Sequence, residues 1–447
     1  MRKNLIVHVV PHTHWDREWY GPFQQFRLRL VRLMDKLLPL LENNPHYPHF
    51  NLDGQTVPLL DYLEIRPERR PTLEQLVSTR RLGVGPWFVL PDEFIPSAES
   101  HVRNLMLGHR IARAFGYVQK VGYIPDTFGH IGQLPQILLG FGMDTAVNWR
   151  GLDPHLNRSE AWWESPDGSR VLLAVLPPYC GYCHAGPLPR DVDEAANDLL
   201  ALARHEAQRA STHVLLALSG VDHLEPRPDL PDILRQANSK GDGVQFIHSS
   251  LEGYFSALKA ATANVPLPTI RGEQREISRR PSSGAYLLYN VLSARIYNKI
   301  QNARVQTLLE RWAEPWSALL AHEGLDYPAA FLWRAWQWLL ENHPHDSIGG
   351  CSVDEVHAQM ETRFAWAADI AEHITEERLQ LAARSLNLSD VRDQEAVMVL
   401  FNGVAWDRDE VFTVDIDLPM RYLNRLALAQ AERKPPLTKE TDHPTLI

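Results

Sequence analysis

The feature that most constrains this chain is a short apolar run, Leu5 to Val10, followed at once by a polar segment that ends at Trp19. A continuous apolar run of this length is typical of a strand buried on both faces of a parallel sheet. His14 and Asp16 follow it, and residues two apart in an extended chain point to the same side. Such a pair can bind one Zn²⁺ ion, with His12 supporting it from behind. The other interpretation is a polar strand end without a metal.

Two more segments place similar side chains at the ends of expected elements. Asp126 follows an apolar run at 121–124, so we expect it at the same edge of the sheet, although a helix N-cap after a turn would use the same residue. Farther on, a helix must end before Pro344, and His345 and Asp346 come next. His343, His345 and Asp346 in one turn indicate a functional site, and a purely structural turn is the alternative.

Strand-like and helical stretches alternate up to about residue 265. The expected strands include residues 5–10, 121–124 and 214–218, and the expected helices include 24–43 and 191–210. Alternation of this kind predicts a parallel sheet or barrel with helices outside it. We therefore predict an α/β catalytic domain over residues 1–268.

The pattern changes in the second half of the chain. Residues 285–387 have helical periodicity and few strand signals, which predicts a helix bundle. The sequence from Ser352 to Glu355 is typical of a capping box at the start of a long helix. After residue 390, Val397 to Phe401 and the Asn402-Gly403 turn predict the first strands of a β module over 390–420, too short to close. For residues 424–447 we expect an irregular tail.

Charge and cysteine content exclude several classes of protein. The net charge is −10 over 447 residues, and no block of Lys or Arg indicates a surface for nucleic acid or anionic lipid. No stretch has the apolar length of a membrane span, and three cysteines do not form a disulfide framework. His8 and Pro11 interrupt the N-terminal apolar run before it reaches the length of a signal peptide. We expect a cytoplasmic protein that binds a small substrate, and a homo-oligomer is compatible with this sequence.

These segments, in this order, resemble glycoside hydrolase family 38, the class II α-mannosidases, and most closely its bacterial branch that includes mannosylglycerate hydrolases. The resemblance covers nearly everything to about residue 420. Further matching stretches are Leu52 to Thr56, Gly85 to Trp87, Ser97 to Ser100, Gly129 to Pro135 and Ser165 to Ser169. The resemblance implies a (β/α)7-type barrel, then a helix bundle, then large β domains, of which we expect only the start here.

The resemblance also implies the ligands of one zinc ion. They are His14, Asp16, Asp126 and His345. Co²⁺ is a competitor for a site with mixed nitrogen and oxygen ligands. By the same resemblance, the bound metal contacts hydroxyls of the sugar and favours distortion of its ring.

Catalytic roles follow from the same resemblance and from the chemistry of retaining glycosidases. Two carboxyl groups about 5 Å apart must flank the anomeric carbon. Asp126 is the expected nucleophile, and Asp222, at the end of the expected strand 214–218, is the expected acid and base. Trp19 is the expected platform for the sugar ring and Asp346 the expected acceptor for its hydroxyls. A loop aspartate and a core tryptophan are the alternatives for Asp222 and Trp19.

Asp92 and Arg150 are lesser candidates for substrate contacts, and a structural salt bridge would explain them equally well. The predicted reaction is hydrolysis of α-mannosides, or of mannosylglycerate, with retention of configuration. A non-catalytic relative that keeps the site without its β domains is a further alternative.

Two other classes of protein share part of this pattern. Cys180 and Cys183, followed by His184, match the short pattern for covalent haem attachment, although the segment is rich in Pro and Gly and lies within the expected barrel. A pair of loop thiols is the simpler interpretation. A zinc-dependent deacetylase would also use an Asp/His/His site. Release of acetate instead of mannose would identify it.

Overall fold

Strand β1 (Leu5–Thr13) organises the first sheet. It pairs in parallel with β8 from Ile6 to Pro11, while β9 lies beside its first half and β2 beside its last two residues. The strand is longer than the expected 5–10 because its pairing continues to Thr13. The other strands of this five-stranded sheet are β2 (Phe50–Leu52), β3 (Leu82–Gly83), β8 (Val214–Ser219) and β9 (Val244–His248).

A second five-stranded sheet has the order β10-β6-β7-β5-β4. Its strands are β4 (Gly122–Tyr123), β5 (Thr145–Asn148), β6 (Glu160–Glu164), β7 (Arg170–Val175) and β10 (Thr269–Arg271). The β6–β7 pair is antiparallel and the other pairs are parallel. The predicted α/β class with parallel pairing is confirmed. The strands from β1 to β10 form two sheets within the described residues, so closure into a barrel stays a prediction.

The computed structural model describes residues 4–152, 156–240, 243–276, 287–392, 397–411, 413–415 and 445–446, which form two compact units. Met1–Thr307 and Ala330–Ile370 belong to the first unit, and Leu308–Ala329 and Ala371–Ile447 to the second. These units do not test the predicted boundaries at 268, 285, 387 and 390. Among the described residues, no helix combines the length and apolar character needed to cross a membrane.

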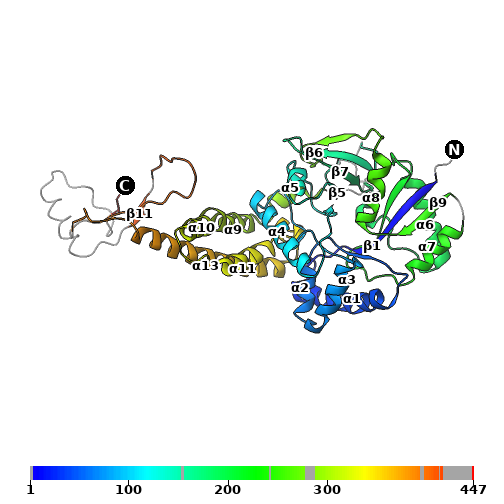
Figure 1. Ribbon diagram of the computed structural model, residues 1–447, viewed down its shortest axis with the longest axis horizontal. Coiled ribbons are helices and arrows are strands. Elements are labelled where there is room, and N and C mark those ends of the chain that lie inside the picture. The colour runs from blue at the N-terminus through cyan, green and yellow to red at the C-terminus, as the bar shows by residue number, and fades with distance from the viewer. Residues whose placement is uncertain are drawn as a thin grey trace. The chain divides into compact units, whose positions relative to one another are not determined.

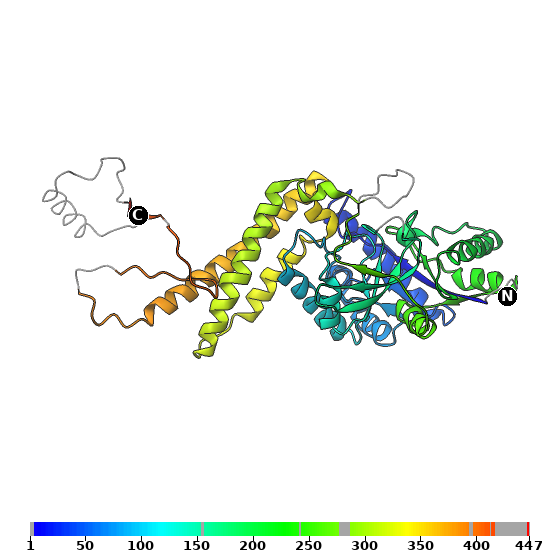
Figure 2. The ribbon, with the colours of Figure 1, turned by 90° about the horizontal axis from the view of Figure 1, so that it is seen from above.

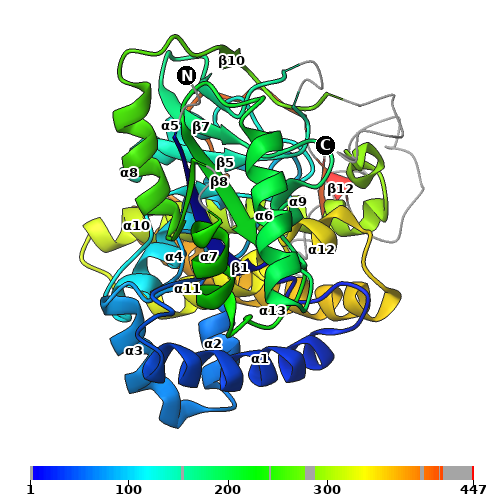
Figure 3. The ribbon, with the colours of Figure 1, turned by 90° about the vertical axis from the view of Figure 1, so that its right-hand side faces the viewer.

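Helices surround the sheets of the first unit (Figures 1 and 2). In Figure 3, α6 and α8 lie on either side of β1 and β8, with α1 below them. The helices up to residue 276 are α1 (Phe23–Asn43), α2 (Val57–Leu63), α3 (Arg70–Ser78), α4 (Ala98–Ala114), α5 (Leu134–Gly140), α6 (Val192–Glu206), α7 (Leu230–Ser239) and α8 (Leu251–Thr262), and short 3-10 turns are η1 (Pro67–Arg69) and η2 (Gly181–Cys183).

Apolar side chains explain why these helices pack where they do. Helix α1 buries Phe26, Leu30, Leu33 and Leu37, a spacing of three or four residues that forms one stripe along the helix. Helix α8 packs Leu251, Tyr254, Phe255 and Leu258 into a cluster that includes side chains from both sheets. The two sheets therefore share one apolar core, which fixes the ends of their strands in space.

The remaining helices follow residue 287. They are η4 (Tyr289–Leu292), α9 (Ile296–Thr307), the π-helical turn η5 (Leu308–Ala313), α10 (Glu314–His322), α11 (Ala329–Leu340), α12 (His345–Gly349) and α13 (Asp354–Arg384). Helix α13 begins within the predicted capping box. Within the range predicted to be helical, residues 308–313 form the π-helical turn η5, where the wider turn changes the spacing of side chains.

The predicted strand at Val397 to Phe401 is absent from the structure. An isolated apolar run is not stable as a strand without a partner, and none of the described residues pairs with it. Instead, β11 (Val414–Asp415) pairs in antiparallel fashion with β12 (Thr445–Leu446), which lies in the range expected to be irregular. Residues 416–444, which include most of that tail, lie outside the described residues.

Candidate metal centre

The end of β1 is joined to the segment after β8 by backbone hydrogen bonds. The N–H of His14 donates to the carbonyl of Val221 at 3.3 Å, and the N–H of His223 donates to the carbonyl of His14 at 2.9 Å. A parallel β-bridge therefore pairs His14 with Asp222. Parallel pairing thus brings two of the predicted residues together, although they are more than two hundred positions apart in sequence.

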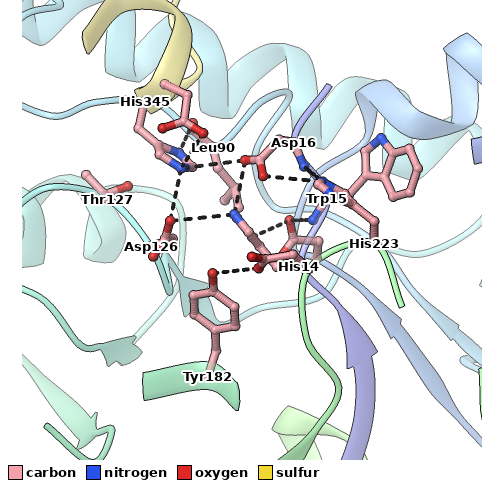
Figure 4. Close-up of polar contacts among 12 residues, drawn as sticks. His14, Trp15, Asp16, Leu90, Asp126, Thr127, Tyr182, His223 and His345 are labelled. Carbon is pink, nitrogen blue, oxygen red and sulfur yellow. Dashed lines mark hydrogen bonds and ion pairs between the residues drawn. The ribbon is translucent and has the colours of Figure 1, made fainter. Parts of the chain in front are cut away.

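Four side-chain atoms from three distant segments form a closed ring. His14 Nε2 lies 3.1 Å from Asp16 Oδ1 and 3.8 Å from Asp126 Oδ2. His345 Nε2 lies 3.3 Å from Asp126 Oδ2 and 3.6 Å from Asp16 Oδ1. Figure 4 shows both imidazoles and both carboxylates pointing toward one another. All four residues are buried.

The geometry and donor atoms of this ring fit a zinc ion. Ligand atoms at about 2.1 Å from a tetrahedral ion lie about 3.4 Å from one another, and the four nitrogen–oxygen distances are near that value. The possible ligand atoms form two overlapping groups of three within 4.8 Å, His14 with Asp126 and His345, and Asp16 with His345 and Asp346. Mixed imidazole nitrogen and carboxylate oxygen donors are those that zinc accepts. The Nε2 atoms of His14 and His345 are buried, and each faces carboxylate oxygens of Asp16 and Asp126. Each can therefore bind a cation in place of a proton.

The second nitrogen of each imidazole is held by a neighbouring group. His345 Nδ1 contacts the carbonyl oxygen of Leu90 at 3.4 Å, and His14 Nδ1 lies 3.0 Å from Asp53 Oδ2. Asp53 is itself fixed, because Oδ2 accepts a hydrogen bond from the N–H of Trp15 at 2.7 Å. A proton on Nδ1 leaves Nε2 as the coordinating atom, which is the usual arrangement behind a metal-binding histidine.

Sequence reasoning missed Asp53 and gave its supporting role to His12. His12 Nε2 instead contacts the carbonyl of Tyr182 at 3.0 Å, and burial lowers the pKa of His12 to about 3. Asp53 lies in the stretch Leu52 to Thr56, which the sequence comparison singled out without a role. A carboxylate directly after a strand was the signal that could have found it.

Clustered carboxylates set the ionisation of the ring. Burial lowers the pKa of both imidazoles, but neighbouring carboxylates outweigh it. Asp53 and Asp16 hold the pKa of His14 well above its usual value, and Asp346 and Asp126 help to raise that of His345 to about 9. The group of carboxylates therefore attracts positive charge, whether it is carried by protons or by a cation.

Asp126 is held as an anion by Arg150. Burial opposes ionisation, but Arg150 and His345 together lower the pKa of Asp126 to about 2. Arg150 Nε donates to Asp126 Oδ1 at 2.8 Å and to its backbone carbonyl at 3.1 Å. The guanidinium also lies 4.2 Å from the ring centre of Trp149, which limits its movement. Arg150, predicted as a substrate contact or a salt-bridging residue, therefore forms a salt bridge here.

Asp222 lies next to His14, with which it forms the β-bridge. Tyr182 donates a hydrogen bond from its hydroxyl to Asp222 Oδ1 at 2.7 Å, and its ring centre lies 4.9 Å from that of His14. The neighbouring His223 lies 3.3 Å from Asp16 Oδ2 through its Nε2 atom. Neither Tyr182 nor His223 was predicted, because nothing in a single tyrosine or histidine identifies its partner.

A buried ion pair connects the first segment to the one that carries His345. Glu18 is fully buried and accepts hydrogen bonds from both terminal nitrogens of Arg363 and from the hydroxyl of Ser347 at 3.0 Å. Arg363 Nε also donates to Asn342 Oδ1 at 2.6 Å. Removal of either charge would leave the other buried without compensation. This pair therefore stabilises the placement of His345 relative to β1.

Three other predicted residues have different surroundings. Asp346 Oδ2 lies 4.0 Å from His345 Nε2, and burial raises the pKa of Asp346 to about 6. Trp19 is partly buried and its backbone carbonyl accepts from the N–H of Val353 at 2.9 Å. Asp92 is fully buried, and its Oδ1 accepts from the N–H groups of Phe94 and Ile95, as in a loop. Substrate contact by each of them stays a prediction.

The haem interpretation finds no support in the structure. Both ring nitrogens of His184 contact backbone carbonyls, those of Gly181 at 2.8 Å and Leu216 at 3.1 Å, so neither is available to iron. Cys180 and Cys183 are free thiols in and beside η2, and burial raises the pKa of Cys183 to about 12. A pair of unreactive loop thiols is the description that fits.

Known families match most of the chain. Residues 4–273 match the family described as "Glycosyl hydrolases family 38 N-terminal domain". Residues 287–381 match the "Alpha mannosidase middle domain". Both His14 and Asp126 fall in the first match, and His345 falls in the second.

Individual relatives agree with these matches. A "Putative mannosylglycerate hydrolase" of Halalkalibacterium halodurans is 38% identical over 419 residues, which are 90% of this chain and 46% of that protein. Human "Alpha-mannosidase 2C1" is 27% identical over 91% of this chain and 37% of its own. The crystal structure of an alpha-mannosidase from Enterococcus faecalis superposes with a TM-score of 0.84 and 36% identity, over 92% of this chain and 46% of that one. The chain spans less than half the length of these relatives.

Proposed function

Because the chain belongs to glycoside hydrolase family 38, we propose that it hydrolyses α-mannosidic bonds at the end of β1 and is zinc-dependent. The observation that supports this most directly is the clustering of His14, Asp16, Asp126 and His345, in which each imidazole Nε2 lies 3.1–3.8 Å from both carboxylates. The names of the relatives favour α-mannosides or mannosylglycerate as substrates.

The four converging side chains would hold one Zn²⁺ ion, and Co²⁺ is the divalent ion expected to replace it. When bound, the ion supplies positive charge for orienting sugar hydroxyls and for stabilising the distorted ring. The chain's own contribution is rigidity. Asp53 and the carbonyl of Leu90 fix the two imidazoles before any ligand arrives.

Asp126 is the proposed nucleophile. It must be ionised to attack the anomeric carbon, and its lowered pKa keeps it so throughout the neutral range. Arg150 binds Oδ1, while Oδ2 is the atom that faces His14 and His345. Attack by the carboxylate breaks the bond to the leaving group and forms a glycosyl ester, which water then hydrolyses with retention of configuration.

Asp222 is the proposed acid and base. It protonates the departing oxygen in the first step and takes a proton from water in the second. The hydrogen bond from Tyr182 fixes one carboxyl oxygen and leaves the other for these transfers. Trp19 and Asp346 are the proposed contacts for the sugar ring and its hydroxyls, and Asp92 is the weakest candidate because it is fully buried.

One experiment separates this function from its rivals. Purified protein would be analysed for bound metal and assayed with an aryl α-mannoside, with mannosylglycerate and with an acetylated sugar. We expect one zinc per chain, release of mannose, and loss of turnover on chelation that zinc restores. Acetate release alone would instead indicate a deacetylase. Bound zinc with no turnover on any substrate would indicate a non-catalytic relative.

The assignment of Asp222 has its own test. The Asp222→Asn variant should hydrolyse a mannoside with a good leaving group, such as dinitrophenol, much faster than one with a poor leaving group, because only the latter needs protonation. Azide should increase the rate of the variant if deglycosylation limits it. An equal loss with both leaving groups, and no response to azide, would contradict the acid and base role.

A further inference from the structure

A cavity of 320 Å³ lies at the N-terminus of helix α8, and none of its lining residues belongs to the metal centre. The loops before β2, β3 and β4 form one side of it, and the first turns of α8 form the other. Its volume falls within the range of small-molecule sites and is about ten times the share of one water molecule. The side chains that matter most are His49, Arg80, Tyr117, Gln119, Glu252 and Ser256.

Buried polar atoms in the cavity wall have no hydrogen-bond partner among the described residues. His49 and Gln119 are 6% and 2% exposed, and the Nε2 atom of each lacks a partner. Asn51, fully buried beside them, lacks partners for both side-chain atoms. His49 Nδ1 donates to the carbonyl of Arg80 at 2.8 Å, so its Nε2 is an acceptor, whereas Gln119 Nε2 is a donor. A buried polar atom without a partner is unfavourable, so a ligand that both donates and accepts would stabilise this wall.

Gly83 leaves room for the polar side chains of His49, Asn51 and Gln119. A Cβ atom on Gly83 would lie 2.9 Å from Gln119 Oε1, 3.0 Å from His49 Cε1 and 3.1 Å from Asn51 Oδ1. These distances are shorter than van der Waals contact, so any larger residue would displace the polar groups. On the helix side, Ser250 caps α8 by accepting from the N–H of Gly253 at 3.1 Å, which leaves the first turn's other donors near the cavity.

The charge of the cavity is balanced. Burial lowers the pKa of His49 to about 4, so this imidazole is neutral near pH 7. Arg80 contributes one positive charge and stacks at 4.1 Å over the ring of Tyr117. Glu252 contributes one negative charge, and its Oε1 already accepts from the Tyr117 hydroxyl at 2.6 Å and the N–H of Lys120 at 2.9 Å. Neither phosphates nor polycations fit this balance.

We propose that this cavity is a second binding site, for a neutral polyhydroxylated molecule of about monosaccharide size. Hydroxyl groups both donate and accept, so they can donate to the orphaned Nε2 atom of His49 and to Glu252, and accept from the orphaned amide of Gln119. The ring of Tyr117 lines the cavity and offers apolar surface to a sugar, although Arg80 stacks on one of its faces. A zwitterion fits less well, because Oε1 of Glu252 already accepts two hydrogen bonds and Arg80 is stacked on Tyr117.

Binding of D-mannose can be measured by calorimetry on the full chain carrying Asp126→Ala and His345→Ala, which disables the metal centre. We expect saturable binding with one site per chain. In the same background, Ser256→Trp should weaken it at least tenfold, because Ser256 is an exposed residue at the cavity wall. Ala260→Trp, one helical turn away and outside the lining, is the matched control and should have no effect.

A second variant tests the same site in case Ser256→Trp does not fold. Gln119→Leu keeps the volume of the side chain and removes the orphaned donor, so it should also weaken binding of D-mannose by about tenfold. Absence of saturable binding by D-mannose, D-glucose and glycerol would overturn the proposal. So would binding that Ser256→Trp and Gln119→Leu leave unchanged, or binding of glycine in place of the sugars.

Discussion

The two ends of strand β2 lie beside two buried histidines whose pKa values are shifted in opposite directions. Asp53 follows the strand and faces His14, whose pKa is raised well above its usual value. His49 precedes the strand, and burial lowers its pKa to about 4. Both histidines are almost completely buried, so burial does not explain the difference. Carboxylate neighbours do, because Asp53 and Asp16 outweigh desolvation at His14 and no carboxylate compensates His49.

This difference shows how one α/β scaffold builds two kinds of polar site. At the metal centre, charged groups compensate one another and attract a cation. At the cavity beside α8, neutral groups remain partly unsatisfied and suit a neutral ligand. The charge state of a buried histidine is thus set by the groups next to it. Substitutions at the metal centre and at the cavity test this.

The largest effect is expected from the metal centre itself. Asp126→Ala removes the proposed nucleophile and one of the four converging donors, so turnover of an aryl α-mannoside should fall roughly thousandfold or more. Bound zinc should fall with it, while the circular dichroism spectrum stays that of the folded chain. Asp144→Asn, which removes an exposed carboxylate paired with Lys259, is the matched control and should retain both. Near-normal turnover by Asp126→Ala would contradict the proposed mechanism.

The next effect concerns the ion pair that positions His345. Arg363→Met leaves Glu18 buried and uncompensated, so the free energy of unfolding should fall by about 3–5 kcal/mol. The double variant Glu18→Gln/Arg363→Met removes both charges and should recover much of that loss in chemical denaturation. If the double variant is as unstable as the sum of the two single variants, the pair does not act as a unit.

Prediction from sequence succeeded where a side chain follows a strand or a sharp turn. His14 and Asp126 were expected near each other because each follows an apolar strand, although the structure places those strands in two different sheets. The family resemblance was needed to add His345. Asp53, Tyr182 and the Glu18–Arg363 pair were missed, because their partners are determined by tertiary packing. The strand expected at Val397 to Phe401 failed for a related reason, since a strand needs a neighbour that local sequence does not reveal.

A smaller effect is expected from acidification at the other end of β2. His49 has a lower pKa folded than unfolded, so between about pH 6.5 and pH 4 the unfolded chain binds more protons. Stability should therefore fall as pH falls through this window, with His49 contributing up to about 3 kcal/mol. The measurement is the free energy of unfolding against pH for the natural chain and for His49→Gln. Curves with the same slope between pH 6.5 and pH 4 would show that His49 is not buried as a neutral group.

The smallest effect is expected from the hydrogen bond between Tyr182 and Asp222. Tyr182→Phe keeps the ring beside His14 and removes only the hydroxyl that donates to Asp222, so kcat should fall about tenfold. Because the hydroxyl acts through the proposed acid, the loss should be larger for a poor leaving group than for a good one. Zinc content and the free energy of unfolding should hardly change, since the hydroxyl touches no metal-binding atom. A loss that is equal for all leaving groups would mean that Tyr182 orders the whole site. The hydroxyl would then not act specifically through Asp222.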